Sequence, residues 1–186
     1  MVENEFKIML TKEQYERLCG AYCWDRTVTQ HNNYYDTPEL MLSRGHITCR
    51  VRTLPEGAFL QMKLPNGPAY SRIELEKKLE GVPEELSASE INALAGEYLS
   101  EPLPDVVRIG VLTTERRVKG FVGAEIDLDR SSYFGVTDYE LEIEFTDEGR
   151  ASELLAKVRE TAEITTPAEV CTGKIHRFLQ EYRKNR

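Results

Sequence analysis

The segment 138–146, with the sequence DYELEIEFT, alternates between acidic and apolar side chains. Successive side chains of a β-strand point to opposite faces of its sheet. A strand built from this segment therefore has two unlike faces, an apolar one with Tyr139, Leu141, Ile143 and Phe145 and an acidic one with Glu140, Glu142 and Glu144. The apolar face must be covered, which restricts the chain to folds in which helices or a second sheet pack against such strands.

The same alternation recurs along the chain, with charge on one face and apolar side chains on the other. In the opening residues, Glu3, Glu5 and Lys7 share one face of an expected first strand, opposite Phe6 and Ile8. The pattern and the turn sequences between the segments predict further strands at about 29–36, 46–54, 58–64, 70–79, 110–119, 121–129 and 138–146.

Helices are expected at four places between and after these strands. Capping-box sequences at Thr11 and Ser87 each predict the start of a short helix. Apolar residues at helical spacing predict two longer amphipathic helices, at about 148–162 and 174–184. These helices can cover the apolar faces of the strands.

Eight antiparallel strands with short connections can close into a barrel, which removes exposed sheet edges and encloses a cavity. If the helices cover the outside, the charged faces line the interior. We therefore expect an α+β fold, an eight-stranded antiparallel β-barrel or tunnel with a charged interior, flanked by several helices. An open antiparallel sheet with its charged face in solvent is the alternative that strand counting leaves open.

The length of 186 residues predicts one domain, spanning 1–186, with a full-sized core. The formal net charge of −8 disfavours binding to DNA or to an anionic membrane surface, and no stretch approaches membrane-spanning length. Cys19 and Cys23 are spaced as reduced packing residues on a helix. A cytoplasmic protein without a membrane segment is expected.

The expected interior combines two kinds of charge. Clustered carboxylates attract a hard divalent cation such as Mg²⁺, which bridges carboxylate and phosphate oxygens. Arginine forks match phosphate oxygens in pairs, whereas lysine acts as a point charge. An interior with both kinds of group suits a linear triphosphate. The acids are Glu3, Glu5, Asp127, Glu142 and Glu144, and the bases are Lys7, Arg50, Arg52 and Lys63.

An ordered set of motifs along almost the whole chain resembles a known family. The motifs are Glu3-x-Glu5-x-Lys7, NYYDTP at 33–38, Arg50-Val51-Arg52, MKLP at 62–65, Thr114-Glu115-Arg116, IDLD at 126–129, DYELEIE at 138–144 and GKIHRF at 173–178. The chain resembles the CYTH superfamily, or triphosphate tunnel metalloenzymes, and within it the small bacterial single-domain branch often labelled adenylate cyclase.

The resemblance implies roles for these residues. One or two Mg²⁺ or Mn²⁺ ions would be held by Glu3 and Glu5 with Glu142 or Glu144, and Asp127 would bind a second ion or position water. Either Arg116 or Arg117 could face the tunnel, because a β-bulge in 113–117 would exchange them, and Arg116 is the preferred residue. The phosphates would be bound by Lys7, Arg50, Arg52, Lys63, Arg116, Lys174 and Arg177. Lys174 and the five acids form the expected catalytic set.

The resemblance implies a metal-dependent triphosphatase for a small triphosphate or polyphosphate. Inorganic tripolyphosphate is the leading substrate, with nucleoside or thiamine triphosphates next. A class IV-type adenylate cyclase is the enzymatic alternative, although no residues clearly build an adenine pocket. A non-catalytic polyphosphate-binding protein is the alternative outside enzymes. The sequence leaves the oligomeric state open between a monomer and a homodimer.

Overall fold

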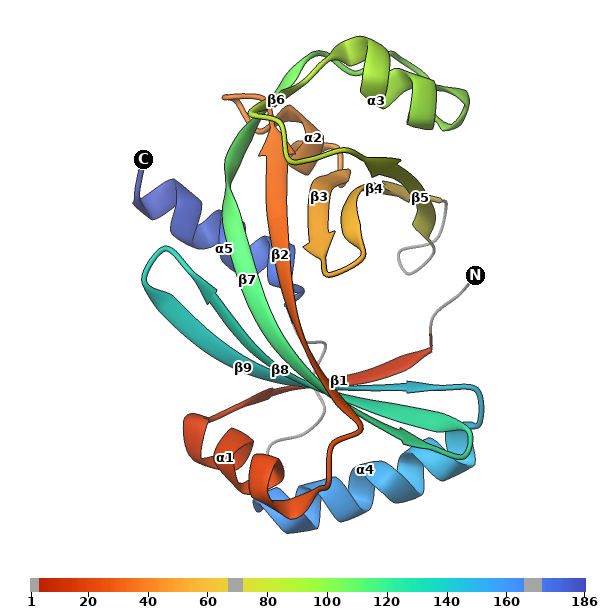
Figure 1. Ribbon diagram of the computed structural model, residues 1–186, viewed down its shortest axis with the longest axis vertical. Coiled ribbons are helices and arrows are strands. Elements are labelled where there is room, and N and C mark those ends of the chain that lie inside the picture. Colours follow the sequence, from red (N-terminus) through yellow and green to blue (C-terminus); the bar gives the residue numbers. More distant parts are fainter. Residues whose placement is uncertain (1–3, 67–71, 166–171) are drawn as a thin grey trace. The chain divides into compact units, whose positions relative to one another are not determined.

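The computed structural model describes residues 4–66, 72–165 and 172–186, and the chain forms two compact units. Unit 1 contains the chain up to Thr29 together with Thr113–Asn185, and unit 2 contains Gln30–Leu112 and Arg186. Strands β2 (Arg26–Asp36) and β7 (Val106–Phe121) run through both units (Figure 1). The expectation of one domain over 1–186 stays a prediction.

Unit 1 is built on antiparallel strands in the order β1-β9-β8-β7. Lys7 and Asp127 both lie opposite Glu142 in the register, one on each side of it. Beside β7, the elements of unit 1 are β1 (Glu5–Leu10), α1 (Lys12–Ala21), β8 (Ala124–Tyr133), β9 (Val136–Phe145), α4 (Glu148–Ala162) and α5 (Lys174–Lys184).

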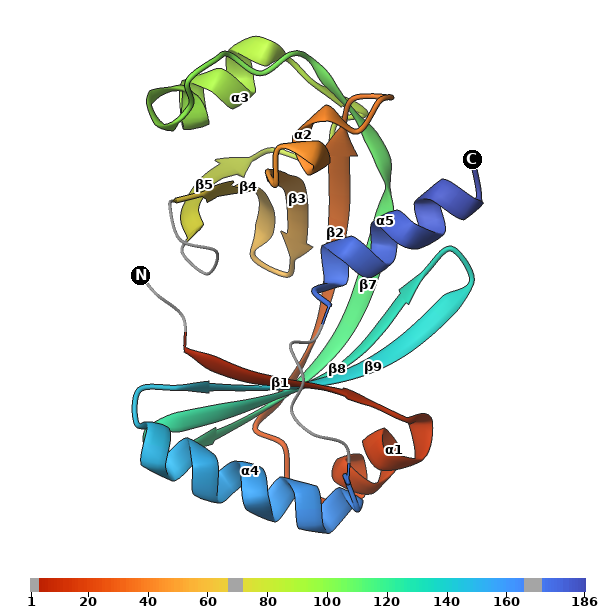
Figure 2. The ribbon, with the colours of Figure 1, turned by 180° about the vertical axis from the view of Figure 1, so that it is seen from behind.

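Helices α1 and α4 cover the apolar face of β1, β8 and β9, and both lie on the same side of these strands (Figure 2). Ile126, Ile143, Leu18 and Val158 are fully buried between the sheet and the two helices. The Thr11 hydroxyl accepts a hydrogen bond from the backbone N–H of Gln14, and the Gln14 side chain accepts one from the backbone N–H of Thr11. The predicted capping box therefore starts α1.

The C-terminal helix α5 packs on the β8–β9 hairpin through aromatic contacts. The ring of Phe178 lies 4.9 Å from that of Phe134 and 6.1 Å from that of Tyr133, measured between centroids. Phe178 and Leu179 are buried, whereas Lys174 and Arg177 extend from the same helix to acidic side chains of the strands. This amphipathic helix thus brings two cations to the acidic face of unit 1.

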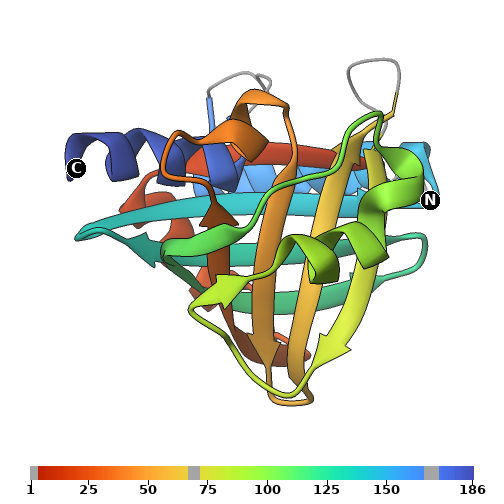
Figure 3. The same cartoon turned by 90° about the horizontal axis from the view of Figure 1, so that it is seen from above.

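Unit 2 continues the antiparallel arrangement in the order β2-β3-β4-β5, and β6 pairs with β7. Helix α3 crosses β4 and β5 (Figure 3), and its Ile91 and Ala95 pack with Leu60 and Met62. The elements are α2 (Met41–Arg44), β3 (Thr48–Leu54), β4 (Gly57–Pro65), β5 (Arg72–Leu79), β6 (Glu85–Leu86), α3 (Ala88–Ala95) and the 3₁₀ turn Gly96–Tyr98.

The antiparallel α+β fold with its flanking helices is confirmed, and nine strands form among the described residues. Strand β7 begins at Val106 rather than near 110, and β3 begins at Thr48 because His46 adopts a positive φ of 57°. The two short elements α2 and β6 were not expected. Part of the predicted turn at 65–68 lies outside the described residues. Closure of the sheet into a barrel stays a prediction.

The α2 turn is held by a single buried carboxylate. Asp36 accepts hydrogen bonds from the backbone N–H groups of Thr37, Leu42 and Ser43, at 2.8 to 3.0 Å. A helix of four residues carries no apolar period, so the sequence pattern could not reveal it.

Among the described residues, no helix has both the length and the apolar character needed to cross a bilayer.

The burial of the apolar face predicts that Ile143→Ala lowers the free energy of unfolding by about 2–5 kcal/mol, because it leaves a cavity beneath α1 and α4. Val122 is 75% exposed, and Val122→Ala should change stability by less than about 0.5 kcal/mol. Urea denaturation of both variants measures the difference. Equal effects would show that β9 does not bury this face.

Candidate functional site

The acidic residues of unit 1 are brought together by strand register. Glu142 of β9 lies between Lys7 of β1 and Asp127 of β8, and Glu144 lies opposite Glu5. One row further along the same face, Glu140 lies opposite Asp129. Side chains two residues apart on one strand and directly opposite on its neighbours share a face. The antiparallel pairing therefore collects acids from three strands at one place.

Arg116 of β7 binds three of these acids at once. Its guanidinium donates to both oxygens of Asp129, at 2.8 and 2.7 Å, and to Glu142 at 2.6 Å. It also donates to Asp127. Arg116 lies opposite Asp129 in the register, so the two side chains point to the same face. The fixed fork of the guanidinium suits such multiple contacts better than a lysine would.

Two further cations reach the same acids from other elements. The Nζ of Lys174 on α5 lies 2.7 Å from Glu142 and 2.9 Å from Asp129. The Nζ of Lys7 on β1 lies 2.9 Å from Glu5 and 3.2 Å from Glu142. Glu142 therefore receives cations from β1, β7 and α5.

Arg177, one turn along α5 from Lys174, extends the network to two more acids. Its Nε donates to Asp138 at 2.8 Å, and one of its terminal nitrogens donates to Glu140. Asp129 and Glu140 are completely buried, and Asp127 is only 2% exposed. Burial of charge is costly unless the charge is paired, which explains the density of ion pairs.

The pairing does not balance the charge. Among the described residues of this network, seven carboxylates face four cations, Lys7, Arg116, Lys174 and Arg177. The seven are Glu5, Asp127, Asp129, Asp138, Glu140, Glu142 and Glu144. The excess of acid in this partly buried network is what a metal cation or a bound proton would neutralise.

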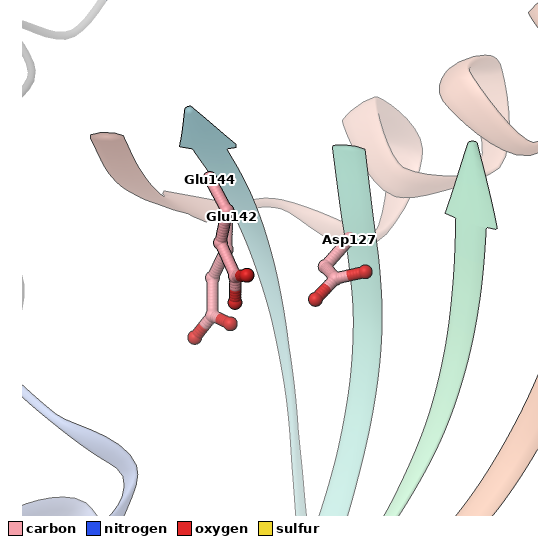
Figure 4. Close-up of side chains that lie close together, drawn as sticks. All are labelled: Asp127, Glu142 and Glu144. Carbon is pink, nitrogen blue, oxygen red and sulfur yellow. The ribbon is translucent and has the colours of Figure 1, made fainter. Parts of the chain in front are cut away.

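The metal-binding potential is concentrated in three of the acids. Asp127, Glu142 and Glu144 each offer an oxygen within 4.8 Å of the others, and their side chains project to one side of the sheet (Figure 4). The Oδ1 atom of Asp127 is buried and has no hydrogen-bond partner within residues 4–66, 72–165 and 172–186. A hard divalent cation binds such oxygens directly, so these residues fit a metal of that kind.

The surroundings shift the pKa values of the neighbouring acids Asp127 and Glu142 in opposite directions. Burial raises the pKa of Asp127 to about 7, with Asp129, Glu144 and Glu142 adding to the rise and Arg116 opposing it. Burial also acts to raise the pKa of Glu142, but Lys174, Arg116 and Lys7 together hold it well below its ordinary value. Glu142 is therefore ionised at neutral pH, whereas Asp127 is only partly ionised without a bound cation.

Eight of the predicted site residues lie together in unit 1: Glu5, Lys7, Arg116, Asp127, Glu142, Glu144, Lys174 and Arg177. Arg116 faces the acids, whereas Arg117 points to the opposite face, near Tyr15 and Glu115. Alternation along β7 decides between the two arginines, and no bulge exchanges them. Glu3, the first acid of the opening motif, lies outside the described residues.

The other three predicted cations lie in unit 2. The Nε of Arg50 donates to the amide oxygen of Gln61 at 2.8 Å, and the Nε of Arg52 donates to that of Asn32 at 2.9 Å. The Nζ of Lys63 lies 2.5 Å from Glu74. No carboxylate among the described residues pairs with Arg50. A neutral amide orients this guanidinium without neutralising it, which leaves its charge for an anionic ligand.

Three acids of the network, Asp129, Asp138 and Glu140, were not among the predicted site residues. Each is held by a predicted cation, Arg116, Lys174 or Arg177. The period-two signal that selected Asp127 and Glu142 also places Asp129 and Glu140 on the same face. That signal could have identified them, but it could not show that helix α5 would cover this part of the face.

Comparison with known proteins places the chain among relatives with the same fold. It is 29% identical over 198 residues to "Putative triphosphatase YjbK" of Bacillus subtilis (strain 168), covering 99% of this chain and 97% of that protein. A crystal structure of a "putative adenylate cyclase" from Bacillus halodurans matches with a TM-score of 0.72 and 26% identity, over 95% of this chain and 97% of the other.

HpAC1 from Hippeastrum, named as an adenylyl cyclase with a dominant triphosphatase activity, matches with a TM-score of 0.73. It is 22% identical, and the match covers 96% of this chain and 95% of that one, so the likeness concerns the fold alone. The family model for the CYTH domain matches residues 1–178. Since this match spans nearly the whole sequence, the chain belongs to the CYTH domain family.

Proposed function

We propose that the protein is a metal-dependent triphosphatase whose substrate is a small linear triphosphate, with inorganic tripolyphosphate first. The observation that carries the proposal is the meeting of Asp127, Glu142 and Glu144 beside the cations Lys7, Arg116 and Lys174 on one face of unit 1. Membership of the CYTH family supports it, as does the likeness to a Bacillus subtilis protein named as a triphosphatase.

Asp127, Glu142 and Glu144 would hold Mg²⁺ or Mn²⁺, with Glu5 next in the register. Glu3 stays a proposed ligand from the opening motif. When bound, the ion would neutralise part of the acid excess and polarise phosphate oxygens. The partly ionised state of Asp127 makes it the residue whose protonation would respond most to that ion.

The cations of unit 1 are proposed to contribute to phosphoryl transfer in two ways, by holding the carboxylates and by attracting the phosphate oxygens. Burial would lower the pKa of Lys174, but Asp129, Glu142 and Glu140 raise it above its ordinary value, so the ammonium stays charged at neutral pH. Arg116 and Lys174 hold the carboxylates in position, and their positive charges would stabilise phosphate oxygens whose negative charge grows as a phosphoryl group is transferred. Lys7 and Arg177 are proposed to assist in binding the phosphates.

Arg50, Arg52 and Lys63 of unit 2 are proposed as further phosphate ligands. Arg50 and Arg52 are oriented by the amides of Gln61 and Asn32. At Arg50, a polyphosphate oxygen would compete with a neutral amide, which binds a guanidinium less strongly than a carboxylate does. These residues would therefore favour longer polyphosphates, which reach more cations than orthophosphate does.

An adenylate cyclase is the second candidate, because a structural neighbour carries that label. A product-resolved assay separates the two. With Mg²⁺ or Mn²⁺ present, we expect orthophosphate and pyrophosphate from tripolyphosphate, slower turnover of ATP, GTP and thiamine triphosphate, and no cyclic AMP from ATP. Cyclic AMP and pyrophosphate in equal amounts would establish the cyclase instead. Binding without turnover of any substrate would leave a polyphosphate-binding protein.

Replacement of the partly ionised acid should separate stability from metal binding. Because the folded-state pKa of Asp127, about 7, lies above its ordinary value of 3.8, ionising it costs stability as the pH rises between these values. At pH 8, Asp127→Asn should stabilise the metal-free protein by at least about 1 kcal/mol, or about 2–4 °C in Tm.

The same variant should lose the rise in Tm that Mg²⁺ or Mn²⁺ gives the wild type, together with triphosphatase activity. Glu153→Gln is the control, since Glu153 is an exposed acid of α4, which packs on the side of the strands opposite the cluster. A metal-induced rise in Tm that persists in Asp127→Asn would show that the ion binds elsewhere.

The loss of affinity caused by removing one cation of unit 2 should increase with the length of the polyphosphate. Arg50→Gln is expected to weaken tripolyphosphate binding by about tenfold and orthophosphate binding far less, because a charge-assisted hydrogen bond is removed. Calorimetric titration with ortho-, pyro- and tripolyphosphate measures this. Lys77→Gln removes an exposed charge of β5 as the control. An equal loss at every length, or the same loss in the control, would indicate a general charge effect.

A further inference from the structure

Unit 1 has a polar cavity on the side of β7, β8 and β9 opposite the carboxylates. Its volume is about 290 Å³, and it is lined by Lys12, Tyr15 and Glu16 of α1 and by Glu115, Arg117 and Arg130 of the strands. Pockets for drug-sized ligands measure about 300–1,000 Å³. This cavity therefore suits a small ion with some of its water rather than a nucleotide.

Two buried donors at this cavity lack partners. The hydroxyl of Tyr15, a residue only 6% exposed, and the Nε of Arg117 make no hydrogen bond within the described parts of the chain. The Cys19 thiol beside Tyr15 is only a weak acceptor. Tyr15 and Arg117 line the same cavity; burial raises the pKa of Tyr15, and the Arg117 guanidinium opposes that rise. Buried polar groups without partners are rare in folded proteins and call for an explanation.

The charge of the lining favours an anion. Lys12 and Glu16 pair at 3.6 Å, and Arg117 reaches Glu115 only at 3.4 Å, the limit of a hydrogen bond. Arg130 pairs with no acid in the residues that the structure describes. The lining thus has one more positive than negative group, in a chain whose net charge is −8. An acceptor with several oxygens would satisfy the donors that the protein leaves unmatched.

We infer that this cavity binds a small oxyanion, with its oxygens on the Tyr15 hydroxyl and the guanidinium groups of Arg117 and Arg130. Phosphate and carboxylate groups share this chemistry. The site is separate from the metal cluster, because side chains of adjacent residues on a strand point to opposite faces. Arg116, Asp129 and Glu140 form one row across the acidic face, and Glu115, Arg130 and Tyr139 form the neighbouring row on the other face.

The experiment is a titration of the metal-free full chain, followed through the ¹H–¹⁵N signal of the Arg117 side-chain Nε–H. Orthophosphate and acetate are added separately, with sodium chloride at matched ionic strength as the screening control. A saturable chemical-shift change with phosphate or acetate, absent with chloride, is expected. The ligand that binds with the higher affinity shows whether the site prefers a phosphate or a carboxylate group. A shift that never saturates, or one that chloride reproduces, would overturn the inference.

Variants test the ligand groups. Arg130→Gln, on the exposed rim, should weaken binding by about tenfold, since it removes a charge-assisted hydrogen bond. Tyr15→Phe should also weaken binding, with a Tm equal to or above that of the wild type, because it deletes a buried hydroxyl that has no partner. Lys157→Gln removes an exposed charge on α4 and should leave the affinity unchanged. Full affinity in both Arg130→Gln and Tyr15→Phe, or an equal loss in Lys157→Gln, would refute the site.

Discussion

The ion pairs of Arg116 are the interaction on which the organisation of unit 1 depends. One guanidinium on β7 binds Asp127 and Asp129 of β8 and Glu142 of β9. Without it, buried carboxylates on adjacent strands would face one another with little compensation, and removal of one partner from such a cluster usually costs several kcal/mol. The contacts of Lys174 with Glu142 and Asp129 add α5 to the same network.

The network also shows a conflict between stability and function. A protein selected for stability alone would balance the charges or replace them with apolar side chains. Unit 1 instead keeps more acids than cations in a partly buried network, and this arrangement raises the pKa of Asp127. Such perturbed groups are concentrated at functional sites. The metal ion proposed for this cluster would neutralise the excess negative charge, and that electrostatic attraction would contribute to the affinity for the ion.

The proposed site residues Arg116 and Arg50 are held in different ways. In unit 1, an incoming phosphate would have to compete with carboxylates for Arg116, whereas in unit 2 it would compete only with the amide of Gln61 for Arg50. Arginines bound by amides are thus better suited to capture a phosphate, and those bound by carboxylates are better suited to position the acids. The strands of unit 1 also separate the two proposed sites, since Arg116 and Arg117 lie on opposite faces.

The sequence by itself determined eight of the nine described strands, the helices α1, α3, α4 and α5, and the acidic and apolar faces, because these depend on local periodicity and capping. It also selected eight residues that meet in unit 1. Only the tertiary structure decided that Arg116 rather than Arg117 faces the acids, that Asp129 and Glu140 are fully buried, and that the pKa values of Asp127 and Glu142 move in opposite directions. Those outcomes depend on strand register and on where α5 packs, which bring together charges more than thirty residues apart, and no local pattern contains that information.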